Sequence, residues 1–141
     1  GRAVEYLADK QAGISEADYK VWCFVERMYM EVLNRTADEA GLRNWVSYLQ
    51  NGTMTGIQVA EGFLLSEEFL AKEMTDEEYI HIMYRAFFNR DADLDGLETW
   101  TNALQNGYTK NDVFNGFANS VEFGVLCREA GIMQAFVEGV K

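Results

Sequence analysis

The side chains with the most evident chemical potential form an acidic run, Asp91-x-Asp93-x-Asp95-Gly96. Alternating carboxylates followed by glycine are typical of the front of an EF-hand calcium loop, which also needs a bidentate Glu at position twelve. Counted from Asp91, position twelve is Asn102, so the rear of the cage is missing. Acidic residues are also favoured at helix starts, by capping and by the helix dipole. We therefore expect helix capping here and predict no metal site, with calcium binding as the alternative.

Other patterns for catalysis or metal binding are weak. His81 is the only histidine, and it lies in an apolar-periodic segment with no second His and no neighbouring Cys, which argues against a metal site. No candidate nucleophile occupies a recognisable elbow motif. Most of the 23 acidic residues are expected to face solvent. We predict no catalytic residue, no cofactor and no enzymatic activity.

The two cysteines, Cys23 and Cys127, lack the close spacing of a zinc knuckle or a CxxC redox motif. If the first and last helices touch, a disulfide between these cysteines would close a long loop and stabilise the fold by about 4 kcal/mol in the chain-entropy model. The alternative is two separate buried thiols, because free cysteine is among the most buried residue types. Both alternatives stay open at this point.

One pattern occurs twice and organises the chain. The offset between the copies is 55 at the start, since 84 − 29 = 55, and 54 at the end, since 123 − 69 = 54. Self-similarity at a fixed period predicts a repeat architecture. The matched positions are Tyr29/Tyr84, Arg35/Arg90, Asp38/Asp93, Gly41/Gly96, Trp45/Trp100, Phe63/Phe117, Ser66/Ser120, Glu68/Glu122 and Phe69/Phe123.

The secondary structure indicated by the sequence is helical throughout. Apolar residues recur at helical spacing, proline is absent and no alternating run suggests a strand. A short helix is expected over residues 3–9, and Asp91 or Asp93 is expected to cap a later one. Ser or Thr followed three residues later by an acid or Gln predicts helix starts at Ser15, Thr36, Thr55, Thr75 and Thr109.

The predicted fold is therefore all-α, with two tandem multi-helix repeats. We expect a single domain over residues 1–141, with repeat one at about 15–73, repeat two at about 75–128 and a C-terminal helix at about 131–140. A unit of this size would bury too little surface to be stable alone. The two repeats are therefore expected to pack around one shared core.

One arginine in each repeat is expected to hold that repeat together. Arg35 and Arg90 occupy equivalent places at the end of the first helix of a repeat, and Glu68 and Glu122 occupy equivalent places later in the repeat. We hypothesise a bidentate Arg–Glu pair within each repeat, tying its first helix to its fourth. The alternative is an arginine that binds a partner.

Two tryptophans follow glycines at a helical interval. Gly41 and Gly96 precede Trp45 and Trp100 by four residues, which places each pair on one helix face. We expect the glycine to leave room for another backbone or ring, and the tryptophan to pack in the core. The alternative is a tryptophan platform that stacks on sugar rings, which needs exposed indoles. Trp22 is less constrained and is compatible with the surface.

The charge of the chain limits its partners. A net charge of −11 argues against nucleic acid, because binding phosphates requires Lys and Arg to displace counterions, and it argues against an anionic membrane surface. No apolar run approaches the length of a membrane span. We predict no nucleic-acid binding and no membrane insertion.

The repeated pattern resembles a known bacterial family. Tyr-x-x-x-Leu-x-Arg-x-x-Asp-x-x-Gly-Leu-x-x-Trp, followed by a Gly-containing turn and Phe-x-x-Ser-x-Glu-Phe, is similar to the DUF4214 domain, and it covers residues 29–69 and 84–123. Its first half is more weakly similar to the repeat of phycobilisome linker polypeptides. Phe88 stands where the first copy has Leu33. The resemblance implies a place in large secreted (extracellular) or surface-attached bacterial proteins, and it implies no activity.

We therefore expect a non-catalytic structural or interaction module of a secreted or cell-surface bacterial protein. Its partner would be a wall polymer, a glycan or another protein, bound in a groove between the repeats. The alternative is a glycan- or calcium-binding module with a defined pocket. Exposed, coplanar Trp or Tyr side chains would favour the alternative, whereas fully buried Trp45 and Trp100 would favour a scaffold.

Overall fold

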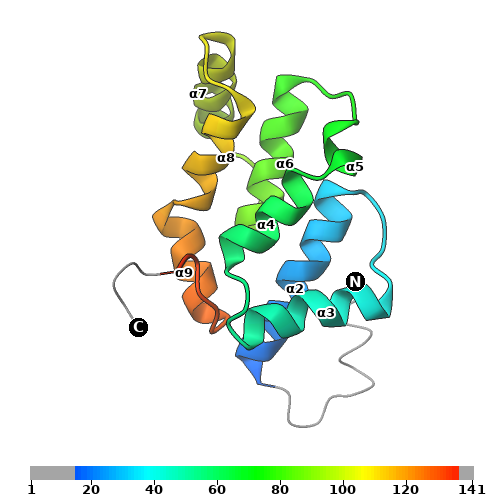
Figure 1. Ribbon diagram of the computed structural model, residues 1–141. Coiled ribbons are helices and arrows are strands. Elements are labelled where there is room, and N and C mark those ends of the chain that lie inside the picture. Colours follow the sequence, from blue (N-terminus) through cyan, green and yellow to red (C-terminus); the bar gives the residue numbers. More distant parts are fainter. Residues whose placement is uncertain (1–14, 137–141) are drawn as a thin grey trace.

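The computed structural model describes residues 15–136, and the predicted all-α class is confirmed, since no strand occurs among these residues. The short helix expected over residues 3–9 lies outside this range. The elements follow one another as shown in Figure 1: α2 (Glu16–Arg27), the π-helix η1 (Met28–Val32), α3 (Glu39–Gln50), α4 (Gly56–Leu64), α5 (Glu67–Leu70), α6 (Asp76–Phe88), α7 (Leu94–Gln105), α8 (Lys110–Ala118) and α9 (Val121–Glu129).

The helices recur in the same order in the two halves. The first helix of repeat one is α2 continued by η1, and that of repeat two is α6. α3 and α7 each have 12 residues, and α4 and α8 each have 9. The fourth helix differs, because α5 has 4 residues and its counterpart α9 has 9. None of the helices described between residues 15 and 136 is long and apolar enough to cross a membrane.

Helix starts are set by side chains that accept hydrogen bonds from the first-turn amides. The predicted caps at Ser15, Thr55, Thr75 and Thr109 are confirmed. The predicted cap at Thr36 is wrong, because Asp38 caps α3 and accepts a hydrogen bond from the Gly41 amide at 3.0 Å. A carboxylate also suits the positive end of the helix dipole. In repeat two, Asp93 and not Asp91 is the cap.

A single core runs through both repeats. Buried side chains from residues 21 to 132 form one apolar cluster. Aromatic contacts cross the boundary between the repeats: the ring centroids of Phe24 and Phe123 are 5.7 Å apart, and those of Phe69 and Tyr79 are 6.3 Å apart. The first helix of each repeat therefore meets the fourth helix of the other. The predicted shared core is confirmed.

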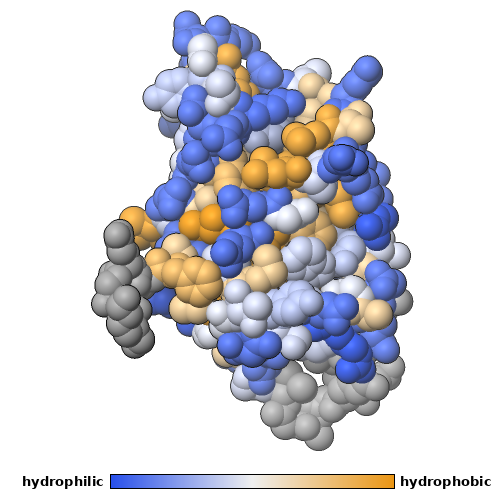
Figure 2. Space-filling model, in the orientation of Figure 1, coloured by the Kyte–Doolittle hydropathy of each residue, from blue (hydrophilic) through white to orange (hydrophobic). Residues whose placement is uncertain are grey.

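Apolar residues also reach the surface. Figure 2 shows them gathered across the middle of one face, over α4 and α6, while hydrophilic residues cover the end formed by α7. Among the exposed apolar side chains are Leu94, with 84% of its area exposed, and Val121, with 81%. Each is the first residue of its helix, α7 or α9.

The C-terminal helix expected over about 131–140 does not begin within the described residues. α9 is followed by Gly131 with a left-handed φ of +71°, and residues 132–136 are irregular. The Ile132 amide donates back to the Cys127 carbonyl at 3.0 Å, which closes the end of α9. Positions 137–140 of the expected helix lie outside the described residues.

This irregular segment instead caps helices of both repeats. The Met133 carbonyl accepts a hydrogen bond from the Gly56 amide at 2.7 Å, and the Gln134 carbonyl accepts one from Ile57 at 3.0 Å. The Gln134 side chain donates to the Ala118 carbonyl at the end of α8, at 2.9 Å. An isolated helix over these residues would lose the contacts to α4, because helical carbonyls bond within their own helix.

Candidate functional site

The signature residues of each repeat gather in one polar cluster, which we name the arginine corner. The two corners have the same composition, as the sequence offset requires. Their members are Tyr29, Arg35, Asp38, Gly41, Trp45 and Glu68 in repeat one, and Tyr84, Arg90, Asp93, Gly96, Trp100 and Glu122 in repeat two.

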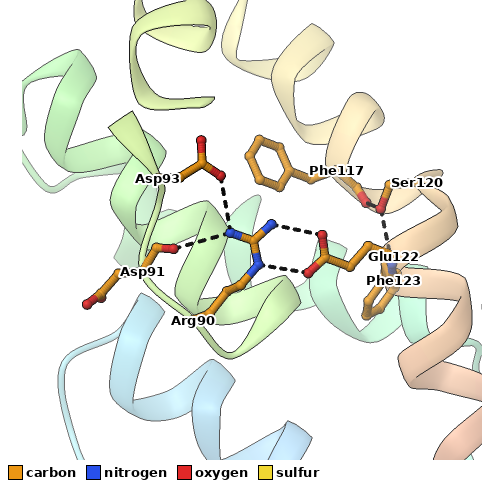
Figure 3. Close-up of polar contacts among 7 residues, drawn as sticks. All are labelled: Arg90, Asp91, Asp93, Phe117, Ser120, Glu122 and Phe123. Atoms are coloured by element: carbon orange, nitrogen blue, oxygen red, sulfur yellow. Dashed lines mark hydrogen bonds and ion pairs between the residues drawn. The ribbon is translucent and has the colours of Figure 1, made fainter. Parts of the chain in front are cut away.

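The structure brings both predicted Arg–Glu pairs together. Arg35 donates from Nε and Nη2 to the Glu68 carboxylate at 3.1 and 3.3 Å. Arg90 donates in the same way to Glu122, at 2.9 Å for both bonds (Figure 3). The hydrogen bond from Arg35 lowers the pKa of Glu68. Planar, two-bond pairing of this kind fixes the geometry of the corner.

Further contacts hold the arginine of each corner. The Arg35 and Arg90 guanidinium carbons lie 5.2 and 5.1 Å from the ring centroids of Tyr29 and Tyr84, a cation–π geometry. In Figure 3 the other side of the Arg90 guanidinium faces Asp93, with Nη1 to Oδ2 at 3.5 Å. Both arginines are thus engaged within their own repeat, although their side chains remain 48% and 42% exposed.

Serine caps place the glutamates. The Ser120 hydroxyl donates to the Phe117 carbonyl at 2.7 Å and accepts from the Phe123 amide at 3.1 Å (Figure 3). These two hydrogen bonds turn the chain sharply between α8 and α9. Glu122 therefore lies in the first turn of α9, opposite Arg90. Ser66 makes the equivalent two bonds in repeat one.

Two asparagines that the sequence patterns did not single out aim the arginines. Asn34 and Asn89 directly precede Arg35 and Arg90, and both have left-handed backbones with φ of 54° and 55°. Among non-glycine residues, asparagine is one of the few that adopts this region readily. Its presence before the arginine in both copies could have predicted the turn.

The expected space beside the repeated glycines holds a tyrosine hydroxyl. A Cβ atom at Gly41 would lie 2.6 Å from the Tyr29 Oη, and one at Gly96 would overlap the Tyr84 Oη. Burial raises the pKa of Tyr29, and a hydrogen bond from Trp45 opposes that rise. Tyrosine is thus the central ring of the corner, a role that the sequence alone did not reveal.

The tryptophans are half-buried and occupy notches made by other glycines. A Cβ at Gly62 would lie 2.9 Å from the Trp45 Cη2, and one at Gly116 would lie 2.6 Å from the Trp100 Cη2. The Trp45 ring centroid is 5.1 Å from that of Phe63. These rings pack against the core rather than forming open platforms.

Trp22, which the sequence left compatible with the surface, is also partly buried against the core.

The acidic run of repeat two is engaged in helix-end contacts. Asp91 accepts a hydrogen bond from Arg85 Nε at 2.9 Å, and Asp93 accepts one from the Gly96 amide at 2.6 Å. Between residues 15 and 136, no three side chains of the metal-ligating types come together. Asp93 therefore caps α7, as one of the two expected alternatives, whereas Asp91 pairs with Arg85. His81 Nδ1 is buried and has no hydrogen-bond partner among the described residues.

A separate pocket of about 470 Å³ lies where the two repeats meet, and we name it the junction pocket. This volume is within the usual range for small-molecule sites. α2 forms one wall and α9 with the residues after it forms the other. Its lining residues are Glu16, Tyr19, Lys20, Cys23, Phe24, Arg27, Asn89, Phe123, Leu126, Cys127, Glu129, Ala130 and Ile132.

Both cysteines line the junction pocket, and both are free thiols. The premise of the disulfide alternative, that the first and last helices touch, therefore holds, but the bond is not formed. Burial raises the pKa of Cys127 to about 12, and burial also raises the pKa of Cys23. Neither thiol is activated as a nucleophile, since reactive cysteines have lowered pKa values.

Arg27 is the charged group of the pocket wall that is mostly buried, and no sequence pattern pointed to it. Its Nε donates one long hydrogen bond, 3.4 Å, to the Ala86 carbonyl. Its guanidinium carbon lies 5.6 Å from the Phe24 ring centroid. Burial lowers the pKa of Arg27 to about 10, so that the side chain still carries its charge at neutral pH.

Comparisons with known proteins place the chain in a family. No curated protein and no solved structure matches it significantly. The family described as "Domain of unknown function (DUF4214)" matches residues 12–73 and again residues 60–127. The two matches overlap, and together they cover both arginine corners. A domain built as a tandem pair, with the same corner in each copy, accounts for both matches, and the chain belongs to the DUF4214 family.

Proposed function

We propose that the chain is a non-catalytic interaction module of a secreted or cell-surface bacterial protein. Its partner is a wall polymer, a glycan or another protein, and the contact is made at the junction pocket. The location rests on the family resemblance, and the role rests on how the polar side chains are used.

The observation that carries the proposal is the internal use of the repeated polar residues. In both corners the arginine binds the glutamate and the aspartate caps a helix. These groups are already engaged within the fold, which supports a structural role for them rather than a catalytic one. The repeated signature is therefore a scaffold, and recognition belongs to residues outside it.

The junction pocket is lined largely by residues that lie outside the repeated signature. Ile82 stands at the repeat-two position of Arg27, since 82 − 27 = 55, and Glu78 stands at that of Cys23, since 78 − 23 = 55. The aromatic contact between Phe24 and Phe123 has an equivalent in the contact between Tyr79 and Phe69. Arg27 and Cys23 have no equivalent arginine or cysteine in repeat two. A feature present once in a duplicated fold is not needed to build the repeat.

Thermal melting against a panel of bacterial wall fractions and glycans, with one calcium sample, tests the proposal. A ligand at about a hundred times its Kd stabilises by roughly 2.7 kcal/mol, a shift of several degrees. We expect one fraction to shift the melting temperature. The recovered fraction should show no new reducing ends or free amines, because the module does not cleave its partner.

Two variants of α9 locate the contact. Leu126→Trp adds bulk inside the junction pocket and should abolish the shift. Val125→Trp adds the same bulk at a neighbouring residue that is 38% exposed and does not line the pocket, so it should leave the shift unchanged. A panel with no shift, or a shift that survives Leu126→Trp, contradicts the proposal, and so does release of cleavage products.

A further inference from the structure

Arg27 differs from the four arginines that form ion pairs in the described part of the chain. Arg35, Arg43, Arg85 and Arg90 each form an ion pair and are 42–48% exposed. Arg27 is only partly exposed and lies deeper than Arg35 and Arg90, yet it forms no ion pair with any carboxylate of the described residues. Glu31 lies one helical turn further on, but it makes no ion pair with Arg27. A buried charge without a partner is unfavourable.

Among residues 15–136, most donors of this guanidinium have no hydrogen-bond acceptor. Arginine carries five N–H donors, and the structure gives Arg27 one hydrogen bond, to a backbone carbonyl at 3.4 Å. The group lines the junction pocket beside Phe24, Phe123 and Leu126. A cation with spare donors on an apolar wall matches a ligand that carries an anion and an apolar body together.

The acidic groups at the mouth of the pocket do not compete for Arg27. Glu16 and Glu129 both pair with Lys20, with each N–O distance 3.6 Å. Their side chains are 84% and 49% exposed, so these two carboxylates belong to the solvent side. The buried positive charge of Arg27 thus faces a pocket whose rim is already paired.

From this geometry we propose that the junction pocket binds a small organic carboxylate with an apolar body, whose carboxylate pairs with Arg27. The guanidinium offers two parallel N–H donors to the two oxygens, as arginine does elsewhere in this chain. Phe24, Phe123 and Leu126 cover the apolar body. The inference rests on the proposed function only in taking the junction pocket as the contact site.

Three eight-carbon probes separate charge from apolar contact. Octanoate, octanol and octylamine share a tail and differ in the head group. Isothermal titration at moderate salt should show octanoate bound at least about tenfold more tightly than octanol, the effect of one charged hydrogen-bonded pair, and octylamine bound least. Octanoate should also slow alkylation of the partly buried Cys23 thiol by iodoacetamide.

Arg27→Met tests the charge while keeping a similar shape. Removing a mostly buried charge that has no counter-ion relieves its desolvation cost, so this variant should melt at the same temperature as the wild type or higher. It should bind octanoate no better than octanol. Arg128→Met removes another arginine from α9 that does not line the pocket, and it should keep the wild-type preference.

Several outcomes overturn the inference: no binding of octanoate, equal binding of octanoate and octanol, or a full preference in Arg27→Met. A lowered melting temperature of Arg27→Met shows a structural arginine and overturns it as well. These results are independent of the wall-fraction panel. Octanoate binding without any wall-fraction shift would support this inference and contradict the proposed function. A wall-fraction shift without octanoate binding would support the proposed function and contradict this inference.

Discussion

At the scale of single residues, each arginine corner contains an exposed ion pair with bidentate geometry. Arg90 and Glu122 are each 42% exposed, and exposed pairs contribute only about 0–1 kcal/mol because water screens them. The two parallel hydrogen bonds of 2.9 Å place this pair at the upper end of that range. The neighbouring pair Arg85–Asp91 has one such bond, and it serves as an internal comparison.

A double-mutant cycle of Arg90→Ala and Glu122→Ala should give a coupling free energy of about 1 kcal/mol in urea unfolding. The cycle of Arg85→Ala and Asp91→Ala should give a coupling free energy of less than about half of that value. Asp91 is 78% exposed, and this pair has one hydrogen bond instead of two. Adding 1 M NaCl should weaken both. Equal couplings for the two pairs would show that bidentate geometry adds nothing here.

A second residue-scale prediction concerns the contact of Tyr84 with Gly96. Gly96→Ala improves helix propensity by up to about 1 kcal/mol, but its Cβ would overlap the Tyr84 hydroxyl. Overpacking costs about 1–3 kcal/mol, so we expect net destabilisation in thermal or urea unfolding. Removing the hydroxyl with Tyr84→Phe should reduce the cost of Gly96→Ala.

The equivalent change in repeat one should have the same sign and be smaller. A Cβ at Gly41 would stand 2.6 Å from the Tyr29 Oη, a less severe approach than at Gly96. A stabilised Gly96→Ala variant would mean that helix propensity outweighs the tyrosine contact.

The sequence predicted the Arg–Glu pairs and not the tyrosine at their centre, for a physical reason. Opposite charges recur at equivalent places in both copies, as Arg35 with Glu68 and Arg90 with Glu122, and this recurrence made an Arg–Glu pair within each repeat the simplest prediction. The space beside Gly41 could hold any ring or backbone, and only the tertiary placement of η1 brings the Tyr29 hydroxyl there. Arg27 was missed because a single arginine in an amphipathic helix carries no pattern.

At the scale of helices, capping explains where most elements begin. Four Ser and Thr caps were predicted from their spacing to an acid or Gln, and the structure confirms them. Thr36 has the same spacing but does not cap, because Ala37 is buried with 1% of its area exposed and the helix starts after Asp38. Local spacing decides a cap only where the tertiary contacts leave the segment free.

This difference gives a matched pair of variants. Thr75→Ala removes the hydroxyl that accepts from the Glu78 amide at 3.1 Å, and it should lower the free energy of unfolding by about 1 kcal/mol. Thr36→Ala removes an exposed hydroxyl that caps nothing, and it should change stability by less than about 0.5 kcal/mol. Equal effects in urea unfolding would contradict the assignment of the caps.

At the scale of the whole molecule, two buried titratable groups lie where the repeats pack against each other. Tyr79 of repeat two packs on Phe69 of repeat one. A Cβ at Gly56 of repeat one would lie 3.0 Å from the Cys127 Sγ. Burial raises the pKa of Cys127 and that of Tyr79, each to about 12. The joint between the repeats is therefore sensitive to alkaline pH.

The direction of this sensitivity follows from which state loses its protons first. The ordinary pKa values are 9.0 for the Cys127 thiol and 10.0 for the Tyr79 phenol, so the unfolded chain deprotonates before the folded one. The stabilisation is fully present below pH 9 and falls as pH rises toward 12, by about 1.4 kcal/mol per pH unit for each group. Between pH 8 and 10.5, Cys127 alone should lower the free energy of unfolding by about 2 kcal/mol.

Urea unfolding at pH 8 and pH 10.5 checks this, with the change between the two pH values as the readout. Cys127→Ala lowers stability at both, because a buried side chain is shortened, but its loss on raising the pH should be smaller than that of the wild type. Cys23→Ala should keep nearly the wild-type loss, since Cys23 is only half-buried. If Cys127→Ala and the wild type lose the same free energy, the buried thiol does not couple alkaline pH to the joint between the repeats.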